Sequence, residues 1–137
     1  MAVLFETSVG DFVIDLYTRN SPATSLNFIK LCKAKYYNNN IFHRVIKNLL
    51  VQSGDPTGSG EGGRCIFNLI DRTKSRFIKD EIKKKALHKV LKFSFPENFQ
   101  FGSVCMASAG KNKIASQFFV VTSKKFLTKS TNLQVNF

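Results

Sequence analysis

Short stretches of alternating residues, separated by turn residues, are the feature that most constrains the fold of this 137-residue chain. Residues 2–7 and 12–17 flank the turn sequence Ser-Val-Gly-Asp, and Phe12, Ile14 and Leu16 alternate along the second stretch. A period of two residues is typical of a half-buried β-strand. Further short strands are predicted at 41–46, 50–53, 104–107 and 117–122.

One helix is predicted early in the chain, beginning at Ser21-Pro22, because Ser is a favoured N-cap and Pro fits the first helical position. It should end at residue 32 or 33, with an apolar face formed by Leu26, Phe28, Ile29, Leu31 and Cys32. Residues 64–102 are hard to read, with a weak helical pattern around 80–91. One early helix among many short strands predicts a single domain with a mainly β fold, a closed or nearly closed β-barrel with helical lids.

The charge of the chain is strongly basic, with a net value of +12. Residues 72–92 carry nine Lys or Arg against Asp80 and Glu81. Such a run can bind RNA through phosphate contacts, and Phe77 and Phe93 could stack on bases. We favour a solvated basic loop, with the two Phe residues in the core, as the interpretation of the same run.

The rest of the composition favours a nuclear or cytoplasmic protein that does not contact a membrane. No apolar run approaches the roughly 18 residues that a membrane span requires. The first residues lack the basic and apolar regions of a signal peptide. Three cysteines without a Cys-x-x-Cys spacing fit a reducing compartment better than secretion.

A glycine-dense run at 54–63 contains the spacing Gly58-x-Gly60-x-x-Gly63, which matches a dinucleotide-binding pattern. That pattern binds phosphate only where it leads into a helix, and residues 64–68 show no helical pattern. No Gly-Lys-Ser/Thr sequence accompanies it. We therefore predict a loop that allows close approach of backbone beside a groove.

Nucleophilic and metal chemistry have little support. Cys65 or Cys105 could pair with His43 or His88, but nothing in the local sequence favours such a pair over small buried cysteines. The His and Cys residues lack the spacing of metal ligands, so we expect no metal and no cofactor. We interpret His43 as a structural or groove-wall residue.

Strand parity groups a different set of side chains. Residues two apart on a strand share a face, so Leu50 lies with Gln52, and Gln117 lies with Phe119. Arg44 likewise shares a face with residues 42 and 46. If these strands are neighbours, one arginine, two amides and apolar side chains line one surface. The alternative is a surface arginine above an ordinary core, and parity alone does not decide between them.

Several motifs in order resemble those of one family. The stretch NSPATSLNFIKLCKAKYYNNNIFHRVIKNLLVQSGDPTGSGEGG resembles the central signature of the cyclophilins, the peptidyl-prolyl cis–trans isomerases. MASAG at 106–110 and SQFF at 116–119 resemble two further motifs of that family. The opening MAVLFETSVGDFVIDLYT is similar to the nuclear, splicing-associated branch in which a cyclophilin domain precedes an RNA-recognition domain.

The resemblance implies a cyclophilin-like antiparallel β-barrel and an enzyme that isomerises X–Pro bonds without a nucleophile. It makes Arg44 the donor to the prolyl nitrogen of the twisted bond and gives Gln52 the role of orienting that donor. The expected lining of the peptide groove and of the proline pocket is His43, Leu49, Leu50, Ala107, Ser108, Ala109, Gln117, Phe119, Phe126, Leu127 and Gln134.

Several departures from the family pattern qualify this expectation. Leu49 and Leu50 replace the usual Phe and Met, and Ser108 replaces Asn. Phe126 occupies the place of a Trp that contributes to cyclosporin binding, so a cyclosporin-type ligand should bind weakly. Gln134 is the nearest counterpart of the pocket histidine. The C-terminal helix and last strand of the family are missing from residues 1–137, so we expect a cyclophilin-like domain that is C-terminally incomplete.

The function predicted from the sequence is therefore isomerisation of X–Pro bonds in protein substrates, assisting folding or remodelling of ribonucleoprotein assemblies. The alternative is a catalytically weak module that binds proline peptides within a splicing or RNA-processing complex. The predicted partners are proline-containing peptides or proteins, with RNA or ribonucleoprotein contact through 72–92. We expect a monomer.

Overall fold

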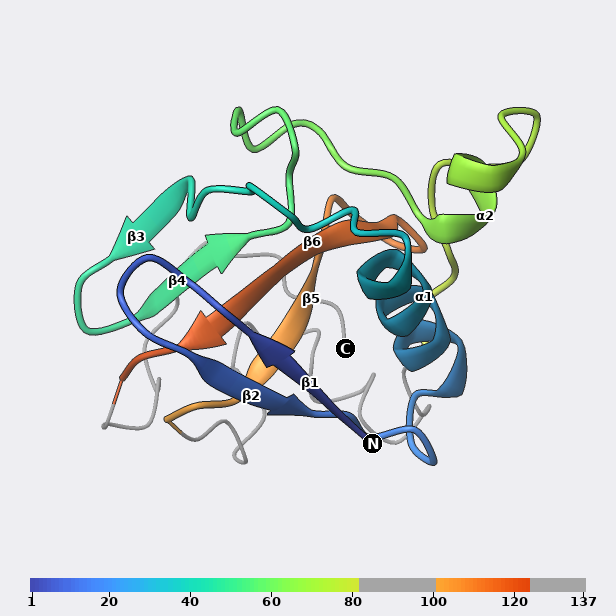
Figure 1. Cartoon of the computed structure of the whole chain (residues 1–137). Helices are drawn as coiled ribbons and strands as arrows, with labels where there is room; N and C mark the ends of the chain where they lie inside the picture. Colours follow the sequence, from blue (N-terminus) through green and yellow to red (C-terminus); the bar gives the residue numbers. More distant parts are fainter. Residues whose placement is uncertain (82–100, 124–137) are drawn as a thin grey trace.

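The computed structural model describes residues 1–81 and 101–123, and its secondary structure is mainly β. Figure 1 shows the elements in chain order. The strands are β1 (Ala2–Phe5), β2 (Phe12–Asp15), β3 (Arg44–Ile46), β4 (Leu50–Ser53), β5 (Val104–Ser108) and β6 (Ile114–Val121), and the helices are α1 (Pro22–Lys33) and α2 (Ile66–Ile70). The prediction of a mainly β fold with one early helix is confirmed.

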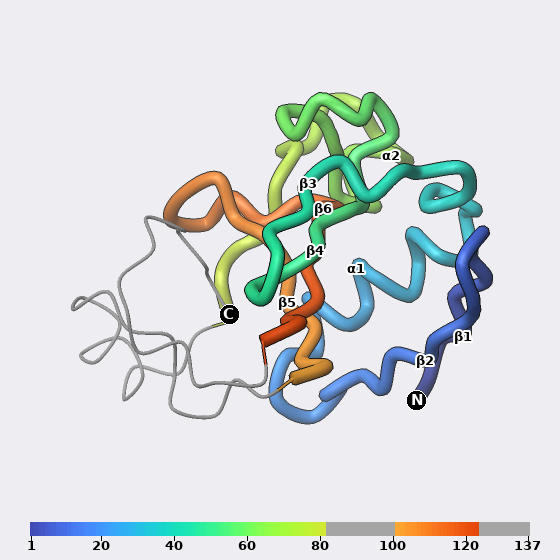
Figure 2. Tube along the Cα trace, turned by 90° about the vertical axis from the view of Figure 1, so that its left-hand side faces the viewer, coloured from blue at the N-terminus to red at the C-terminus, as the bar shows by residue number. Residues whose placement is uncertain are grey.

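The described strands form two antiparallel sheets. β1 and β2 make a two-stranded sheet, and β3, β4, β6 and β5 lie in that order in a four-stranded sheet. In Figure 2 the β1–β2 hairpin and the four-stranded sheet lie on different sides of α1. β6 is central, since it pairs with both β4 and β5.

An aromatic core joins the hairpin, the helix and the four-stranded sheet. The Phe118 ring of β6 lies 5.6 Å from the ring of Phe5 in β1 and 5.6 Å from that of Phe28 in α1. Tyr37, just after α1, packs edge-on to Phe118 at 5.5 Å. Because Phe118 is fully buried at the centre of these contacts, it fixes the position of β6 and thereby of the residues on the opposite face of that strand.

Helix α1 begins as predicted, with Ser21 at the N-cap and Pro22 at the first helical position. The Ser21 side chain makes no capping hydrogen bond. The carboxylate of Glu81 instead accepts hydrogen bonds from the backbone N–H groups of Ala23 and Thr24, at 2.9 and 2.7 Å. This remote cap satisfies two free N–H groups and places a negative charge at the positive end of the helix.

The predicted apolar face of α1 is wrong in one position. Leu26 is 45% exposed, whereas its polar neighbours Ser25 and Asn27 are buried. Asn27 Nδ2 donates to the Ala115 carbonyl of β6 at 2.9 Å, and its Oδ1 accepts from the Ile66 N–H at 2.8 Å. These two bonds to distant backbone groups turn the helix so that Asn27 points inward and Leu26 points outward.

Two more predictions are corrected. The strand predicted at 41–46 is shorter, because the Ile41 carbonyl accepts a hydrogen bond from the Ser53 hydroxyl at 3.0 Å instead of joining the β-ladder. The stretch 64–68 was expected to be non-helical, but residues 66–68 belong to the single-turn helix α2, which starts where Asn27 binds the Ile66 N–H. Of the weak helical pattern around 80–91, residues 80 and 81 are not helical, and the remainder lies outside the described residues, as does Phe93.

Candidate active site

One row of side chains crosses the four-stranded sheet. Arg44 of β3 is paired with Gln52 of β4, Gln52 with Phe119 of β6, and Phe119 with Cys105 of β5. Residues directly opposite each other on neighbouring strands project from the same face of a sheet. The strands are therefore neighbours in the way that the single-surface interpretation requires, and Arg44, Gln52 and Phe119 lie side by side.

Phe119 forms the apolar part of this face. It is 3% exposed and packs in a cluster with Leu49, Leu50 and Val121. Ile46, Cys105 and Ala107 border the cluster and are only partly buried. The cluster thus joins Phe119 to the two leucines that were expected beside it, and Ala107 lies at its edge.

The Arg44 side chain extends from this face toward solvent. Within residues 1–81 and 101–123, no hydrogen bond or ion pair engages its guanidinium, and the residue is exposed. A guanidinium carries five N–H donors and no acceptor. Its hydrogen-bonding capacity is therefore available to a ligand that lies over the Phe119 cluster.

Two amide side chains are locked into a defined orientation beside Arg44. Gln117 Nε2 donates to the backbone carbonyls of Gly60 and Gly62, at 2.8 and 3.0 Å. The Gln117 Oε1 atom consequently faces Gln52, whose Nε2 donates to it at 2.8 Å. Gln52 has one amide end committed to Gln117 and sits opposite Arg44 in the ladder. This arrangement can hold both the arginine and the backbone of a bound peptide.

The glycine-dense run is a loop built around a buried carboxylate. Asp55 accepts hydrogen bonds from the backbone N–H groups of Thr57, Gly60 and Gly62, and from the hydroxyls of Thr57 and Ser59. Desolvation raises the pKa of the Asp55 carboxyl, but these hydrogen bonds outweigh it and lower the pKa to about 2. Because the N–H groups of Thr57, Gly60 and Gly62 bind the protein's own carboxylate, these groups are not free to bind a phosphate.

The glycine loop also lies close to β6, in agreement with the predicted close approach of backbone. A Cβ atom at Gly54, where φ is +90°, would lie 2.5 Å from the Ser116 carbonyl oxygen. The Ser116 hydroxyl donates to the Gly54 carbonyl at 2.7 Å. Only glycine permits this contact, and the contact brings the loop within reach of Gln117.

The remaining predicted site residues are distributed as follows. Ser108, at a β-bulge near the end of β5, donates its hydroxyl to the Gly110 carbonyl at 2.6 Å, and Ala109 is exposed directly after that strand. The His43 ring lies against Gly60, and both ring nitrogens are buried without a hydrogen-bond partner among the described residues. His43 thus packs against the glycine loop, and its role as a groove-wall residue stays a prediction. Phe126, Leu127 and Gln134 lie outside the described residues.

Asp55 and Arg76 are two residues of this region that the sequence analysis did not single out. Asp-Pro before a glycine-rich run is a turn signal that could have drawn attention to Asp55. Arg76 was counted with the basic run, yet its guanidinium donates to the Glu61 and Gly63 carbonyls, both at 2.6 Å. No local pattern predicts a contact over that separation in sequence.

Cysteine and metal chemistry gain no support from the described part of the chain. Burial raises the pKa of the Cys105 thiol, which disfavours the nucleophilic thiolate. Cys65 is fully buried, and its thiol donates to the Ser75 carbonyl at 3.4 Å. In residues 1–81 and 101–123, no cluster of three His, Cys, Asp or Glu side chains could bind a metal ion, and no helix there is long and apolar enough to cross a membrane.

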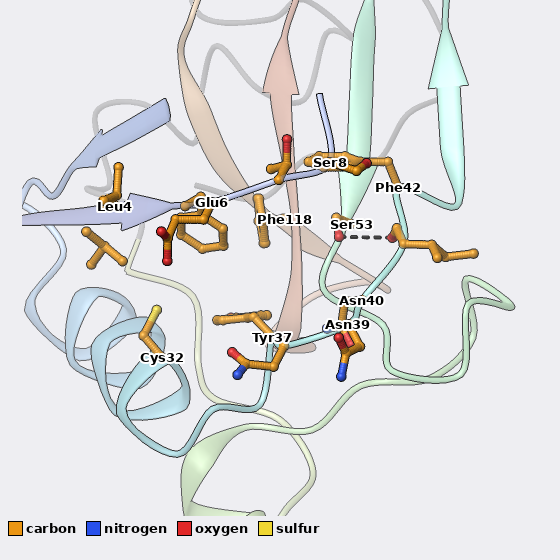
Figure 3. Close-up of a pocket in the computed structure, with 15 residues that line it drawn as sticks. Leu4, Glu6, Ser8, Cys32, Tyr37, Asn39, Asn40, Phe42, Ser53 and Phe118 are labelled. Carbon is orange, nitrogen blue, oxygen red and sulfur yellow. Dashed lines mark hydrogen bonds between the residues drawn. The ribbon is translucent and has the colours of Figure 1, made fainter. Parts of the chain in front are cut away.

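Two pockets lie away from the Arg44 row. One, of about 760 Å³, runs between β1 and residues 38–42, with Tyr37 and Phe118 among its lining residues (Figure 3). The other, of about 290 Å³, is lined by residues of β2, α1 and β5. Arg44, Gln52 and Phe119 line neither of these pockets.

Comparison with known proteins agrees with the fold. A family model described as cyclophilin type peptidyl-prolyl cis-trans isomerase/CLD matches residues 2–134. Peptidyl-prolyl cis-trans isomerase CYP59 of Arabidopsis thaliana is 49% identical over 119 residues, which cover 87% of this chain and 22% of that protein. Peptidyl-prolyl cis-trans isomerase-like 4 of Homo sapiens is 41% identical over 124 residues, which cover 90% and 23%. The chain spans less than a quarter of the length of these two relatives.

A solved structure extends the comparison to three dimensions. A Cryptosporidium parvum cyclophilin type peptidyl-prolyl cis-trans isomerase, crystallised in the presence of the dipeptide Ala-Pro, matches with a TM-score of 0.72 at 33% sequence identity. The match covers 95% of this chain and 73% of that one. The strand order, the ordered motifs and these similarities lead to one conclusion: the chain belongs to the cyclophilin-type peptidyl-prolyl cis-trans isomerase family.

Proposed function

We propose that the chain catalyses cis–trans isomerisation of X–Pro bonds in protein substrates. The observation that supports it best is the position of Arg44, whose guanidinium has no partner among the described residues and which stands in one row with Gln52 and Phe119. A flexible charged donor next to an apolar cluster suits a substrate that is itself an apolar ring carrying one reacting nitrogen.

The chemistry requires neither an acid, a base nor a nucleophile. Amide resonance opposes rotation about the X–Pro bond with a barrier of roughly 18–20 kcal/mol. At the twisted transition state the prolyl nitrogen regains a lone pair, which a guanidinium N–H can bind. Arg44 therefore binds the transition state more strongly than the planar ground state, and this difference accelerates the reaction.

The other site residues hold the peptide. In the proposal, Phe119, Leu49 and Leu50 contact the proline ring, and Gln117 binds the peptide backbone while keeping Gln52 oriented toward Arg44. Residues 107–109 bind the extended chain through their backbone groups, in keeping with the internal hydrogen bond of the Ser108 hydroxyl. Proline-containing peptides are the proposed ligands, as the Ala-Pro dipeptide used with the Cryptosporidium parvum relative suggests.

The test is a peptide exchange assay by NMR, in which the catalysed rate of one Ala-Pro bond is compared between wild type and Arg44→Ala. Losing the donor should slow catalysis about 100-fold, the size seen when one transition-state hydrogen-bond donor is removed. Arg19→Ala, at an exposed arginine between β2 and α1, is the matched control and should leave the rate unchanged. Equal rates for wild type and Arg44→Ala would reject the proposal.

A catalytically weak peptide-binding module is the second candidate. The observation that favours it is the aliphatic cluster, in which Leu49 is 9% exposed and Leu50 is 1% exposed. They replace the larger aromatic and thioether side chains usual at these places in the family, which leaves a looser contact for the ring. Saturable binding of a proline peptide without acceleration of its exchange would decide for this candidate.

Action within nuclear ribonucleoprotein assemblies is the finer part of the proposal. The net charge of +12 and the basic run at 72–92 support it. Binding to RNA through that run should weaken steeply as salt rises, because phosphate contacts release counterions. RNA affinity that does not change with salt would contradict this part of the proposal and leave the isomerase reaction unaffected.

A further inference from the structure

The backbone carbonyls of the glycine loop are shared between two side chains in strict alternation. Gly60 and Gly62 accept from Gln117 Nε2, at 2.8 and 3.0 Å. Glu61 and Gly63 accept from the guanidinium of Arg76, each at 2.6 Å. Gln117 and Arg76 therefore hold interleaved positions of the same four-residue segment.

A third side chain, that of Asp55, binds two N–H groups of the same segment. Asp55 accepts from the N–H of Gly60 at 2.7 Å and from that of Gly62 at 3.0 Å. A glycine-rich segment has more conformational freedom to lose than any other sequence. Fixing its N–H groups with Asp55 alone leaves the carbonyls of residues 61 and 63 unconstrained, and Arg76 supplies that missing constraint.

Arg76 is itself firmly placed. Its own carbonyl accepts from the Cys65 N–H at 2.9 Å, and two residues later the Ile78 N–H donates to Ile114 of β6 at 2.8 Å. The guanidinium also lies over the Phe77 ring, 5.6 Å from its centroid. A guanidinium with two donors in a rigid fork fits two carbonyls at once, which the single ammonium of lysine does not reproduce.

We propose that Arg76 is a positioning residue for the isomerase site, acting through the glycine loop on Gln117 and through Gln117 on Gln52 opposite Arg44. This inference rests on the proposed function. Without the Arg76 fork, the carbonyls of Gly60 and Gly62 no longer present a fixed pair of acceptors to Gln117. Arg76 lies outside the row that touches substrate, so its loss should slow the reaction more than it weakens peptide binding.

The experiment measures the catalysed exchange rate and the dissociation constant of one proline peptide for Arg76→Ala and Arg76→Lys. Arg72→Ala is the matched control, since Arg72 is exposed in the same basic run. We expect Arg76→Ala to lower the rate about tenfold with a dissociation constant within about twofold of wild type. Arg76→Lys, which keeps the charge but has a single donor nitrogen, should fall between, and Arg72→Ala should match wild type. Equal rates for all four proteins would overturn the proposal.

A double-mutant cycle with Gln117→Ala tests the route. If Arg76 acts through Gln117, then Arg76→Ala should cause little further loss of rate in the Gln117→Ala background. If instead the losses of rate caused by the two substitutions multiply, Arg76 acts independently of Gln117, and the proposed route would be overturned.

The side-chain amide signals of Gln52 and Gln117 in ¹⁵N–¹H spectra give a readout that needs no catalysis. These signals should shift in Arg76→Ala and Arg76→Lys but stay in place in Arg72→Ala. A wild type without catalytic activity would reject the proposed function, and the amide signals would then still decide whether Arg76 positions Gln117. Unchanged amide signals in both Arg76 variants would overturn the positioning role whatever the activity.

Discussion

The glycine loop and the Arg44 side chain stand at opposite ends of one set of contacts, and they are held in opposite ways. The loop has its N–H groups bound by Asp55 and its carbonyls bound by Gln117 and Arg76. The Arg44 guanidinium has no partner in the described parts of the chain. The protein thus satisfies the hydrogen bonds of the supporting loop internally and leaves those of the exposed donor open.

This difference predicts that the residues holding the loop contribute to folding stability, whereas Arg44 contributes to the reaction. Residues that hold the loop should matter for folding, because removing them leaves buried polar groups unpaired or forces backbone atoms together. Arg44 should matter little for folding, because truncating its side chain breaks no hydrogen bond or ion pair within residues 1–81 and 101–123. The following variants test the comparison in order of their expected effect on the free energy of unfolding.

Gly54→Ala should have the largest effect, a loss of roughly 2–4 kcal/mol, because the new Cβ would meet the Ser116 carbonyl at 2.5 Å and strain the positive φ. Gly102→Ala is the matched control, since its φ of +86° is nearly the same and no atom of the described residues would lie within 4 Å of its Cβ. Urea unfolding of both variants separates the clash from the strain. Equal losses of unfolding free energy in the two variants would mean that steric contact between the loop and β6 does not add to the backbone strain.

Asp55→Asn should cost about 1–3 kcal/mol, since the amide would turn an N–H group toward the N–H donors that the carboxylate now accepts. Asp71→Asn is the matched control, because Asp71 also begins an Asp-x-Thr turn but its carboxylate accepts hydrogen bonds from Thr73 alone among the described residues. The control should lose less stability in the same denaturant titration. A loss at Asp71 as large as that at Asp55 would remove the special role of the loop carboxylate.

The pH dependence of stability gives a related test. The Asp55 pKa of about 2 in the folded protein lies below the roughly 3.9 of an unfolded Asp. Its contribution is therefore fully present above about pH 4 and is lost as the pH falls toward 2. Denaturant titrations between pH 5 and pH 2 should show a loss of stability in wild type that is smaller in Asp55→Asn. Parallel curves of stability against pH for the two proteins would contradict the assignment of this pH dependence to Asp55.

Arg44→Ala should have the smallest effect on folding, within about 0.5 kcal/mol of wild type, as is usual for exposed positions without special contacts. The same urea titration measures it. A loss as large as that of Asp55→Asn would show that Arg44 is a structural residue and would erase the contrast between the two regions.

The part of this fold that local patterns specify could be predicted. Alternation located the strands to within a few residues, and Ser21-Pro22 marked the start of α1. Strand parity, together with the family motifs, grouped Arg44, Gln52 and Phe119 before the pairing of their strands was known. These features depend on neighbours in sequence or on a repeating period, which one chain is enough to reveal.

The rest depends on contacts between distant residues. Leu26 points outward because Asn27 binds backbone groups of β6 and α2, and α2 forms where that contact anchors it. The roles of Asp55 and Arg76 appear only when the loop is folded. A charge run shows that Arg76 is basic, but it does not show that its guanidinium is committed to two carbonyls of another segment.

The most direct test of the account is to measure, on one sample of Arg44→Ala, both the dissociation constant of a proline peptide and its catalysed exchange rate. If the guanidinium binds the prolyl nitrogen only in the twisted transition state, the rate should fall about 100-fold and the dissociation constant should change less than about threefold. A dissociation constant that rises as much as the rate falls would show that Arg44 only binds the ground-state peptide, and would contradict the account.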